Sequence, residues 1–345
     1  MLGMGRSSRP SFRIDSKDHA GKIRETENWF IDALEEWRIE KKIERFTLLG
    51  HSLGGYMAVC YALKYPGRLN KLILASPVGI PEDPNAVAEP LPDEGGRSGA
   101  DAEMEMDTGA EAKDNNNFLN ARTNNPSSST KPAQPPVKRR LFNWLWDQNV
   151  SVFSFVRWSG PLGPRLVSGW TSRRFGTLPT EEASALHDYS YSLFRQRGSG
   201  EYALGYVLAP GAYARSPLIR RIGAVGRGEY VPAEVGPGIA AREGGEGGDK
   251  LAKVRESGIP VVFMYGSHDW MDVKGGYAAI EKLNAERAKA EAQGGGRAGG
   301  GVGEIHREQA TAKVLIVDKA GHHVYLDGDK AVSYTHLTLP TKRIV

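Results

Sequence analysis

The sequence predicts an α/β fold, with a mostly parallel sheet and a helical segment inserted between two of its strands. An apolar strand, a helix and a second apolar strand follow one another over residues 46–75, at the spacing of a parallel βαβ unit. Two more strand-like apolar runs, 260–265 and 314–317, lie near the C-terminus. Between these regions, residues 139–220 contain four of the seven tryptophans, which predicts a packed helical insertion.

The composition narrows the class of protein. The 345 residues suffice for one large domain or two, and 40% hydrophobic with 25% charged residues is ordinary for a globular protein. No apolar run reaches the roughly 18 residues of a transmembrane helix. The net charge of +4 is too small to indicate nucleic-acid binding. A single cysteine, Cys60, excludes an internal disulfide and a cysteine-rich zinc site. We expect no metal and no cofactor.

The N-terminal elements can be placed from hydrophobic periodicity. Residues 18–45 are predicted to form an amphipathic helix, because large apolar residues recur there at helical spacing. The following elements are expected to be a strand, a tight turn, a helix ended by a Tyr-Pro-Gly sequence and a second strand, at 46–49, 50–55, 56–64 and 72–75.

The rest of the chain alternates between apolar and low-complexity segments. Residues 82–138 are acidic and then rich in Asn, Ser and Pro, so we expect them to be disordered. A helix is expected at 278–292. The expected organisation is a first core part at 1–81, the disordered insertion at 82–138, a helical Trp/Arg-rich lid at 139–220, a Gly-rich linker at 221–258, a second core part at 259–331 with a Gly-rich loop at 285–303, and a tail at 332–345 that is foreign to the gene.

Residues 50–54, Gly-His-Ser-Leu-Gly, fit the pattern G-x-S-x-G. An apolar strand precedes the pattern and a helix follows it, which is the context of a nucleophile elbow. We expect side chains at Gly50 and Gly54 to collide with the neighbouring strand and helix. The turn would present the Ser52 hydroxyl as a nucleophile and leave the Leu53 N–H free for an oxyanion hole. The alternative is a Gly-rich connector without catalysis.

A serine nucleophile needs a base, and the base needs a group that orients it. Behind an elbow the chain order is serine, acid, histidine. The acid is expected after strand 260–265, where Asp269 is preferred and Asp272 is the alternative. The base is expected after the last strand, where a turn contains His322 and His323. We prefer His322, and the alternative is a solvated pair of surface histidines.

Two other histidines and one further motif offer alternatives. His268 is a reserve base that is better explained as lining a pocket or facing water. His51 is expected to be a packing residue, because its backbone directs it away from the Ser52 hydroxyl. Residues His322 to Asp327 fit H-x-x-x-x-D, a pattern associated with glycerolipid acyltransferases, but two fixed letters in six are weak support. Acyl transfer is therefore a minor alternative.

The Trp-rich segment also carries a charge bias. Residues 139–180 contain six arginines against one acid, Asp147. Aromatic side chains with a basic rim suit a membrane interface that contains anionic lipid. The alternative is a helical cap whose tryptophans are core. In either case the segment is expected to act as a lid, and its apolar character favours an acyl chain. The arginines are Arg139, Arg140, Arg157, Arg165, Arg173 and Arg174.

Several blocks resemble an α/β-hydrolase subfamily that includes the fungal mitochondrial cardiolipin-specific deacylases and the ABHD4/ABHD5-like proteins. The resemblance extends over residues 1–81, 139–220 and 259–328. Residues 160–175 are similar to the lid of the fungal members. The blocks that carry it in the core are residues 2–10, 50–55, 265–272 and 321–327.

The resemblance implies Ser52 as nucleophile, His322 as base and Asp269 as acid, with Asp272 left open because members differ there. It implies a serine hydrolase that deacylates a membrane glycerophospholipid, with cardiolipin as the expected substrate, peripherally bound at the mitochondrial inner membrane. Members that act as lipase co-activators lack the serine, so Ser52 favours an active enzyme. The alternatives are a catalytically weak lipid-binding scaffold or co-activator, and a lysophosphatidate acyltransferase.

The resemblance also implies that two strands, and a His-Gly turn that supplies the second oxyanion N–H, precede Met1. We therefore expect Met1 to be an internal methionine of a longer protein and the first strand to be a bare edge. This fragment is then expected to be inactive by itself. No targeting segment is legible, which is uninformative if the chain begins within a fold.

Overall fold

The computed structural model describes residues 1–82, 145–146, 148–176, 178–231, 253–294 and 311–328. They form two compact units, each described here by itself. The first contains residues 1–30 and the described part of 83–216, and the second contains residues 31–82 and the described part of 217–345. Apart from residue 82, the segment expected to be disordered lies outside the described residues, as do positions 295–303 and the tail at 332–345.

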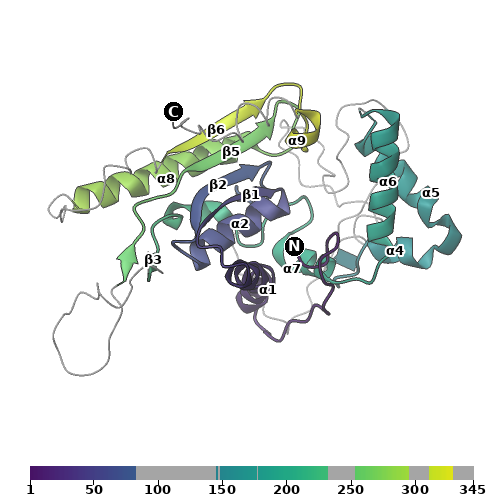
Figure 1. The fold of residues 1–345 in the computed structure, drawn as a ribbon, viewed down its shortest axis with the longest axis horizontal. Helices are drawn as coiled ribbons and strands as arrows, with labels where there is room; N and C mark the ends of the chain where they lie inside the picture. The colour runs from purple at the N-terminus through teal and green to yellow at the C-terminus, as the bar shows by residue number, and fades with distance from the viewer. Residues whose placement is uncertain (83–144, 147, 177, 232–252, 295–310, 329–345) are drawn as a thin grey trace, which may run out of the picture. The chain divides into compact units, whose positions relative to one another are not determined.

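The second unit is built on a parallel four-stranded sheet with the strand order β1-β2-β5-β6 (Figure 1). Every residue of β5 is buried, as expected for a central parallel strand that is covered on both faces. Because the strands are parallel, the residues that follow each of them meet at one edge of the sheet. The strands are β1 (Phe46–His51), β2 (Leu69–Ala75), β5 (Val261–Gly266) and β6 (Ala312–Val317).

Two helices pack on one face of this sheet. In α2 (Leu53–Lys64), the Tyr61 ring lies 5.7 Å from that of Phe46. In α8 (Val273–Gly294), Gly276 lies against the Tyr265 ring. Figure 1 shows α8 extending along β6. The other face holds a cluster of buried residues that includes Val324 of α9 (Val324–Asp327); the others are Ile73, Ala75, Val262, Met264, Val317 and Ala320.

Both helices begin earlier than the sequence predicts. Helix α2 starts at Leu53, directly after the serine, so the turn is shorter than residues 50–55. Helix α8 starts at Val273, where the carboxylate of Asp272 accepts the N–H of Lys274 at 3.0 Å and caps the first turn. It continues to Gly294, so residues 285–294 are helical and not part of a Gly-rich loop.

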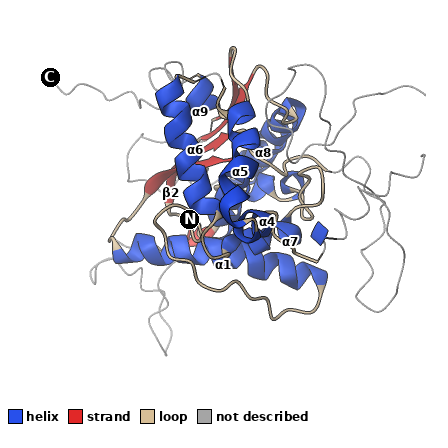
Figure 2. Cartoon of the chain, turned by 90° about the vertical axis from the view of Figure 1, so that its right-hand side faces the viewer, coloured by secondary structure: helices blue, strands red, loops and turns tan. Residues whose placement is uncertain are grey.

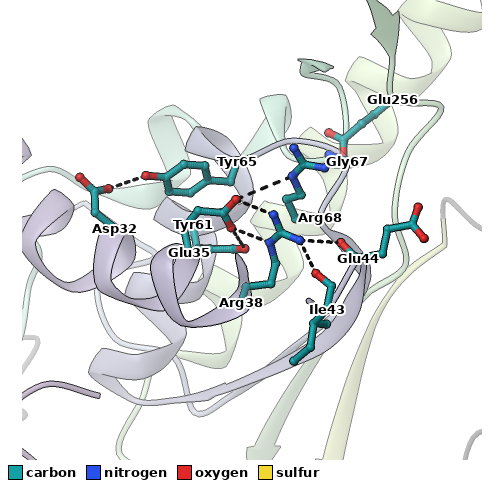
Figure 3. Close-up of polar contacts among 10 residues, drawn as sticks. All are labelled: Asp32, Glu35, Arg38, Ile43, Glu44, Tyr61, Tyr65, Gly67, Arg68 and Glu256. Carbon is teal, nitrogen blue, oxygen red and sulfur yellow. Dashed lines mark hydrogen bonds and ion pairs between the residues drawn. The ribbon is translucent and has the colours of Figure 1, made fainter. Parts of the chain in front are cut away.

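A buried polar network joins α1 (His19–Glu40) to α2 and to the entry of β1 (Figure 3). The Glu35 carboxylate accepts hydrogen bonds from Arg38 at 2.8 Å and from the Tyr61 hydroxyl at 2.6 Å. Arg38 also donates to the carbonyl oxygens of Ile43 and Glu44. The chain that leads into β1 is thereby attached to both helices.

The segment expected to be a linker has short elements at its described ends. Strand β3 (Glu229–Tyr230) pairs with β4 (Val254–Arg255) in an antiparallel ribbon. The 3₁₀ helices η3 (Leu218–Arg220) and η4 (Ile222–Ala224) precede it, and Ile222 is fully buried. These ends are therefore packed, and residues 232–252 between them lie outside the described part.

The first unit consists of short helices, three of which, α4, α5 and α6, pack against one another (Figure 2). The N-terminal residues belong to this unit, where the Ser199 hydroxyl donates to the carbonyl oxygen of Pro10 at 2.6 Å. No helix in the described residues is both long and apolar enough to cross a bilayer. The helices are α4 (Phe153–Trp158), η1 (Gly160–Leu162), α5 (Gly163–Arg174), α6 (Thr180–Phe194), η2 (Gly200–Ala203) and α7 (Leu204–Val207).

The four tryptophans of the predicted lid, residues 139–220, have different environments. Trp146 is buried, and its indole N–H donates to the carbonyl oxygen of Leu208 at 3.0 Å. The Trp170 ring packs 5.5 Å from the Phe194 ring. Trp158 is 74% exposed. Two of the tryptophans are thus packing residues and one faces outward, while Trp144 lies outside the described residues.

Candidate active site

Ser52 lies in a strained turn between β1 and α2. Its φ of 52° and ψ of −118° are values that a residue with a side chain rarely adopts. Two backbone hydrogen bonds attach the turn to the end of β2 and to the segment that follows it. The Ser52 N–H donates to Ala75 O at 2.9 Å, and the Val78 N–H donates to Ser52 O at 3.2 Å. The sequence pattern therefore does form a strand–turn–helix elbow.

The predicted crowding of the elbow glycines is found at one position and not at the other. A Cβ atom at Gly50 would lie 2.3 Å from the carbonyl oxygen of Gly54, so this position requires glycine, as predicted. The prediction for Gly54 is wrong, because a Cβ there would meet nothing within 4 Å. The second crowded position is Gly55, whose Cβ would lie 2.8 Å from Cβ of Pro77. The close approach is to the chain after β2, which the local sequence does not reveal.

Leu53 occupies the first position of α2. The first N–H groups of a helix have no acceptor within that helix, and the helix dipole makes this end favourable for negative charge. This is the position from which the sequence predicts the Leu53 N–H to donate to an oxyanion beside Ser52.

His322 and Asp269 form a buried pair. The Nδ1 atom of His322 lies 3.0 Å from Oδ1 of Asp269, and their side chains are 3% and 0% exposed. They come from the loops after β6 and β5, which are neighbouring strands. This pairing holds the imidazole so that its other nitrogen, Nε2, can act as the base.

The environment keeps the Asp269 carboxyl ionised. Burial is the largest single effect and would raise its pKa, but it is opposed by the hydrogen bond from His322 and by the electrostatic interaction with that ring. The Ser76 hydroxyl and the N–H of Met271 act in the same direction, and the pKa of Asp269 lies below its ordinary value. An ionised carboxylate at this position stabilises the imidazolium that forms when the base takes up a proton.

The alternative acid and the reserve base lie elsewhere. Asp272 accepts the N–H of Lys274 as the cap of α8, so its carboxylate serves the helix and not His322. His268 is exposed, and its Nδ1 lies 3.3 Å from the Ser267 hydroxyl. Of the two aspartates that the sequence left open, the geometry pairs Asp269 with the histidine.

The last residue of the H-x-x-x-x-D pattern also has a different partner. Oδ2 of Asp327 accepts the N–H of Gly321 at 3.0 Å, which closes the turn that carries His322. Asp327 therefore shapes the base-bearing loop, and the side chain paired with the histidine is Asp269.

His51 links the elbow to the base-bearing loop. Its Nε2 lies 3.0 Å from the carbonyl oxygen of His322, and the two rings are 4.7 Å apart. Among the described residues, no hydrogen bond joins the Ser52 hydroxyl to the His322 ring. Catalytic hydrogen bonds are often long before substrate binds, so this geometry is compatible with a nucleophile–base pair.

Two residues of the site were not anticipated. Ser76 is fully buried after the end of β2, has a φ of 45°, and lies beside the Asp269 carboxylate. The Trp270 ring packs 5.0 Å from that of His322. The position of Ser76 directly after a parallel strand could have indicated it, since the elbow and the acid follow their own strands at the same edge.

Known proteins similar to this chain provide an independent comparison. The sequence profile of one family, described as alpha/beta hydrolase fold, matches residues 1–329. A 1-acylglycerol-3-phosphate O-acyltransferase of Arabidopsis thaliana is 32% identical over 332 residues, covering 94% of this chain and 55% of the relative. The chain spans about half the length of the curated relatives it matches.

Two further relatives carry the same enzyme name. The 1-acylglycerol-3-phosphate O-acyltransferase ICT1 of Saccharomyces cerevisiae is 23% identical, over 91% of this chain and 60% of its own length. The 1-acylglycerol-3-phosphate O-acyltransferase ABHD5 of Homo sapiens is 29% identical, over 65% of this chain and 50% of its own length.

Proposed function

From the premise that this chain belongs to the alpha/beta hydrolase fold family, we propose that it supplies the catalytic serine, histidine and aspartate of an enzyme that acts on the acyl esters of membrane glycerophospholipids. The observation that carries this proposal is the buried His322–Asp269 pair, whose histidine lies in a loop that is hydrogen-bonded to the elbow presenting Ser52. Lipid as the substrate class is supported by the relatives named 1-acylglycerol-3-phosphate O-acyltransferases.

The proposed reaction passes through an acyl-serine intermediate. Oγ of Ser52 attacks the ester carbonyl carbon while Nε2 of His322 takes the hydroxyl proton. The Leu53 N–H donates to the oxyanion of the tetrahedral intermediate. When the intermediate collapses, the bond to the glycerol oxygen breaks, and His322 returns the proton to that oxygen. Asp269 keeps the imidazole in the required tautomer throughout.

The acceptor of the acyl group decides between hydrolysis and transfer. Attack by water on the acyl-serine releases a fatty acid, and attack by the hydroxyl of a lysophosphatidate yields phosphatidate. In both cases His322 activates the acceptor, and its partner is Asp269, because Asp327 is engaged by Gly321. Where water is the acceptor, we propose cardiolipin at the mitochondrial inner membrane as the substrate; the relatives' names favour transfer.

An exposed apolar surface in the first unit supports peripheral binding to a membrane. Phe155, Trp158, Leu162 and Leu166 are 51%, 74%, 61% and 55% exposed, and their spacing follows α4, η1 and the start of α5. We call these four residues the apolar ridge. Arg165 is exposed beside it on α5. Large apolar side chains next to a basic one suit the interface of a bilayer that contains anionic lipid.

The proposal can be tested with a fluorophosphonate probe, which reports an activated serine whatever the natural substrate. We expect Ser52 to be labelled by the probe in the full-length protein and the Ser52→Ala variant of that protein to be unlabelled. Incubation with isotopically labelled phospholipid, with and without 1-acylglycerol-3-phosphate, then separates the acceptors by product. Isotopically labelled fatty acid in both reactions indicates hydrolysis. Isotopically labelled phosphatidate that forms only when 1-acylglycerol-3-phosphate is present indicates transfer. A folded full-length protein whose Ser52 does not react with the fluorophosphonate contradicts the proposal.

A further inference from the structure

We infer that His51 is a positioning residue that holds the backbone of the base against the nucleophile elbow, an inference that rests on the proposed function of Ser52 and His322. His51 is the last residue of β1 and directly precedes the serine. Its Nε2 lies 3.0 Å from the carbonyl oxygen of His322, 271 positions further along the chain. The contact therefore joins the segment of Ser52 to the segment of His322, the two residues between which the proposed mechanism moves a proton.

The chemistry of this contact determines which ring nitrogen of His51 carries a proton. A carbonyl oxygen can only accept a hydrogen bond, so Nε2 of His51 must be the donor. This holds for the neutral ring and for the charged ring alike. His51 therefore cannot use Nε2 to take a proton from Ser52, and its role toward His322 is structural support.

The orientation of the His51 ring is set by aromatic packing. Its centroid lies 4.7 Å from that of His322, 4.5 Å from that of His323 and 5.1 Å from that of Tyr325. The last two contacts are edge-to-face, the geometry that aromatic rings prefer. Packing on several sides aims the donor at the carbonyl and limits how far it can move.

Other hydrogen bonds of the base-bearing loop lead in different directions. The N–H of His268, next to the acid, donates to the carbonyl oxygen of Ala320 at 2.9 Å. The N–H of Gly321 donates to Asp327 at 3.0 Å. These contacts place the base relative to the acid and to α9, whereas the contact of His51 places it relative to the nucleophile. A displacement of about 1 Å between reacting groups can lower a rate on the order of 100-fold.

Four variants of the full-length protein separate the effect of the hydrogen-bond donor from that of the ring. His51→Phe keeps the ring and removes the donor. His51→Gln places an amide N–H near the position of Nε2, and His51→Asn has the same amide but too little reach. His51→Ala removes donor and ring together. With the fluorophosphonate probe, we expect the maximal labelling rate of the Phe and Asn variants to fall on the order of 10- to 100-fold with unchanged probe affinity. The Gln variant should recover most of the rate.

A second measurement does not depend on activity. The proton between Nδ1 of His322 and Asp269 gives a downfield NMR resonance, which should shift or broaden in the Phe and Asn variants and return in the Gln variant. Wild-type labelling rates in the Phe and Asn variants would overturn the inference and leave the proposed function intact. A folded full-length wild-type protein that is not labelled would instead overturn the proposed function. In that case, an NMR resonance that no substitution changes would also overturn the positioning role.

Discussion

Two aspartates three positions apart follow β5, and their hydrogen-bond partners separate their roles. Oδ1 of Asp269 lies 3.0 Å from Nδ1 of His322, and Oδ1 of Asp272 accepts the N–H of Lys274 at 3.0 Å. The first contact orients a base, and the second caps a helix. The same side chain thus has a chemical role at one position and a conformational role at the other.

At the scale of single residues, we predict that substitution of the two aspartates by asparagine has unequal effects on fluorophosphonate labelling. Asp269→Asn should lower the rate of fluorophosphonate labelling by a factor on the order of 10³ to 10⁴, because the imidazole adopts the wrong tautomer. Asp272→Asn should leave labelling within a few-fold of wild type, since asparagine is also a good cap. Asp272→Ala should cost about 1 kcal/mol of stability in urea unfolding. A large loss of labelling in Asp272→Asn would assign the acid to that residue.

The lowered pKa of Asp269 also predicts a pH dependence of stability. A carboxyl whose pKa falls on folding binds fewer protons in the native state, so it stabilises the fold above its ordinary value of 3.8. This contribution is lost as the pH falls through the folded pKa. The stability difference between wild type and Asp269→Asn should therefore shrink as urea unfolding is measured at progressively lower pH below about 4. A difference that is constant with pH would contradict the pairing.

At the scale of elements, a buried ion pair holds α1, α2 and the entry of β1 together. The side chains of Glu35 and Arg38 are 10% and 9% exposed. Glu35 also accepts the Tyr61 hydroxyl, and Arg38 donates to two carbonyl groups of the loop before β1. A charge in this position is tolerated only because each partner neutralises the other and the remaining donors are satisfied.

Removing one partner should therefore cost more than removing an exposed pair. Glu35→Ala leaves the Arg38 guanidinium buried without its counter-charge, and we predict a loss of about 3 kcal/mol in urea unfolding. Tyr61→Phe removes one hydrogen bond and should cost about 1 kcal/mol. The control is Lys64→Ala: Lys64 pairs with Asp32 at side-chain exposures of 36% and 41%. Lys64→Ala should lose less than about 1 kcal/mol of stability. A Glu35→Ala variant that loses no more stability than Lys64→Ala would refute the importance of the network.

At the scale of the whole molecule, the expected membrane contact rests more on apolar side chains than on charge. Of the six arginines in residues 139–180, two lie outside the described residues and Arg174 is buried. Arg157 forms an ion pair with Glu201 at 2.7 Å. Arg165 and Arg173 are exposed, and each basic side chain near an anionic surface contributes about 1 kcal/mol. We therefore expect the apolar ridge to contribute more to membrane binding than the described arginines do.

We therefore predict that Trp158→Ser weakens binding of the full chain to cardiolipin-containing vesicles on the order of 10-fold or more, since burying a large apolar side chain contributes about 1.5–3 kcal/mol. Added salt should weaken binding only moderately. Tyr277→Ser is the matched control, because Tyr277 is an exposed aromatic residue, 53% accessible, in the second unit. Sedimentation with vesicles measures both. Equal weakening by the two substitutions would contradict a specific role of the ridge.

Local sequence was sufficient wherever an element depends on its own residues. The apolar runs and their spacing predicted the four parallel strands, and the strand and helix around residues 50–54 predicted the elbow at Ser52. The order of the elements along the chain placed the acid after β5 and the base after β6. These inferences hold because periodicity, turn chemistry and chain order are properties that a sequence displays directly.

Only the tertiary structure decided which of several equivalent residues has a given partner. Asp269 and Asp272 are chemically alike, and the path of the chain into α8 determines which one reaches His322. Gly55, not Gly54, is crowded because the segment after β2 passes beside it. Likewise Trp146 is buried and Trp158 exposed within one apolar segment. In each case the deciding neighbour is remote along the chain, and no local pattern records which atoms will be brought together in space.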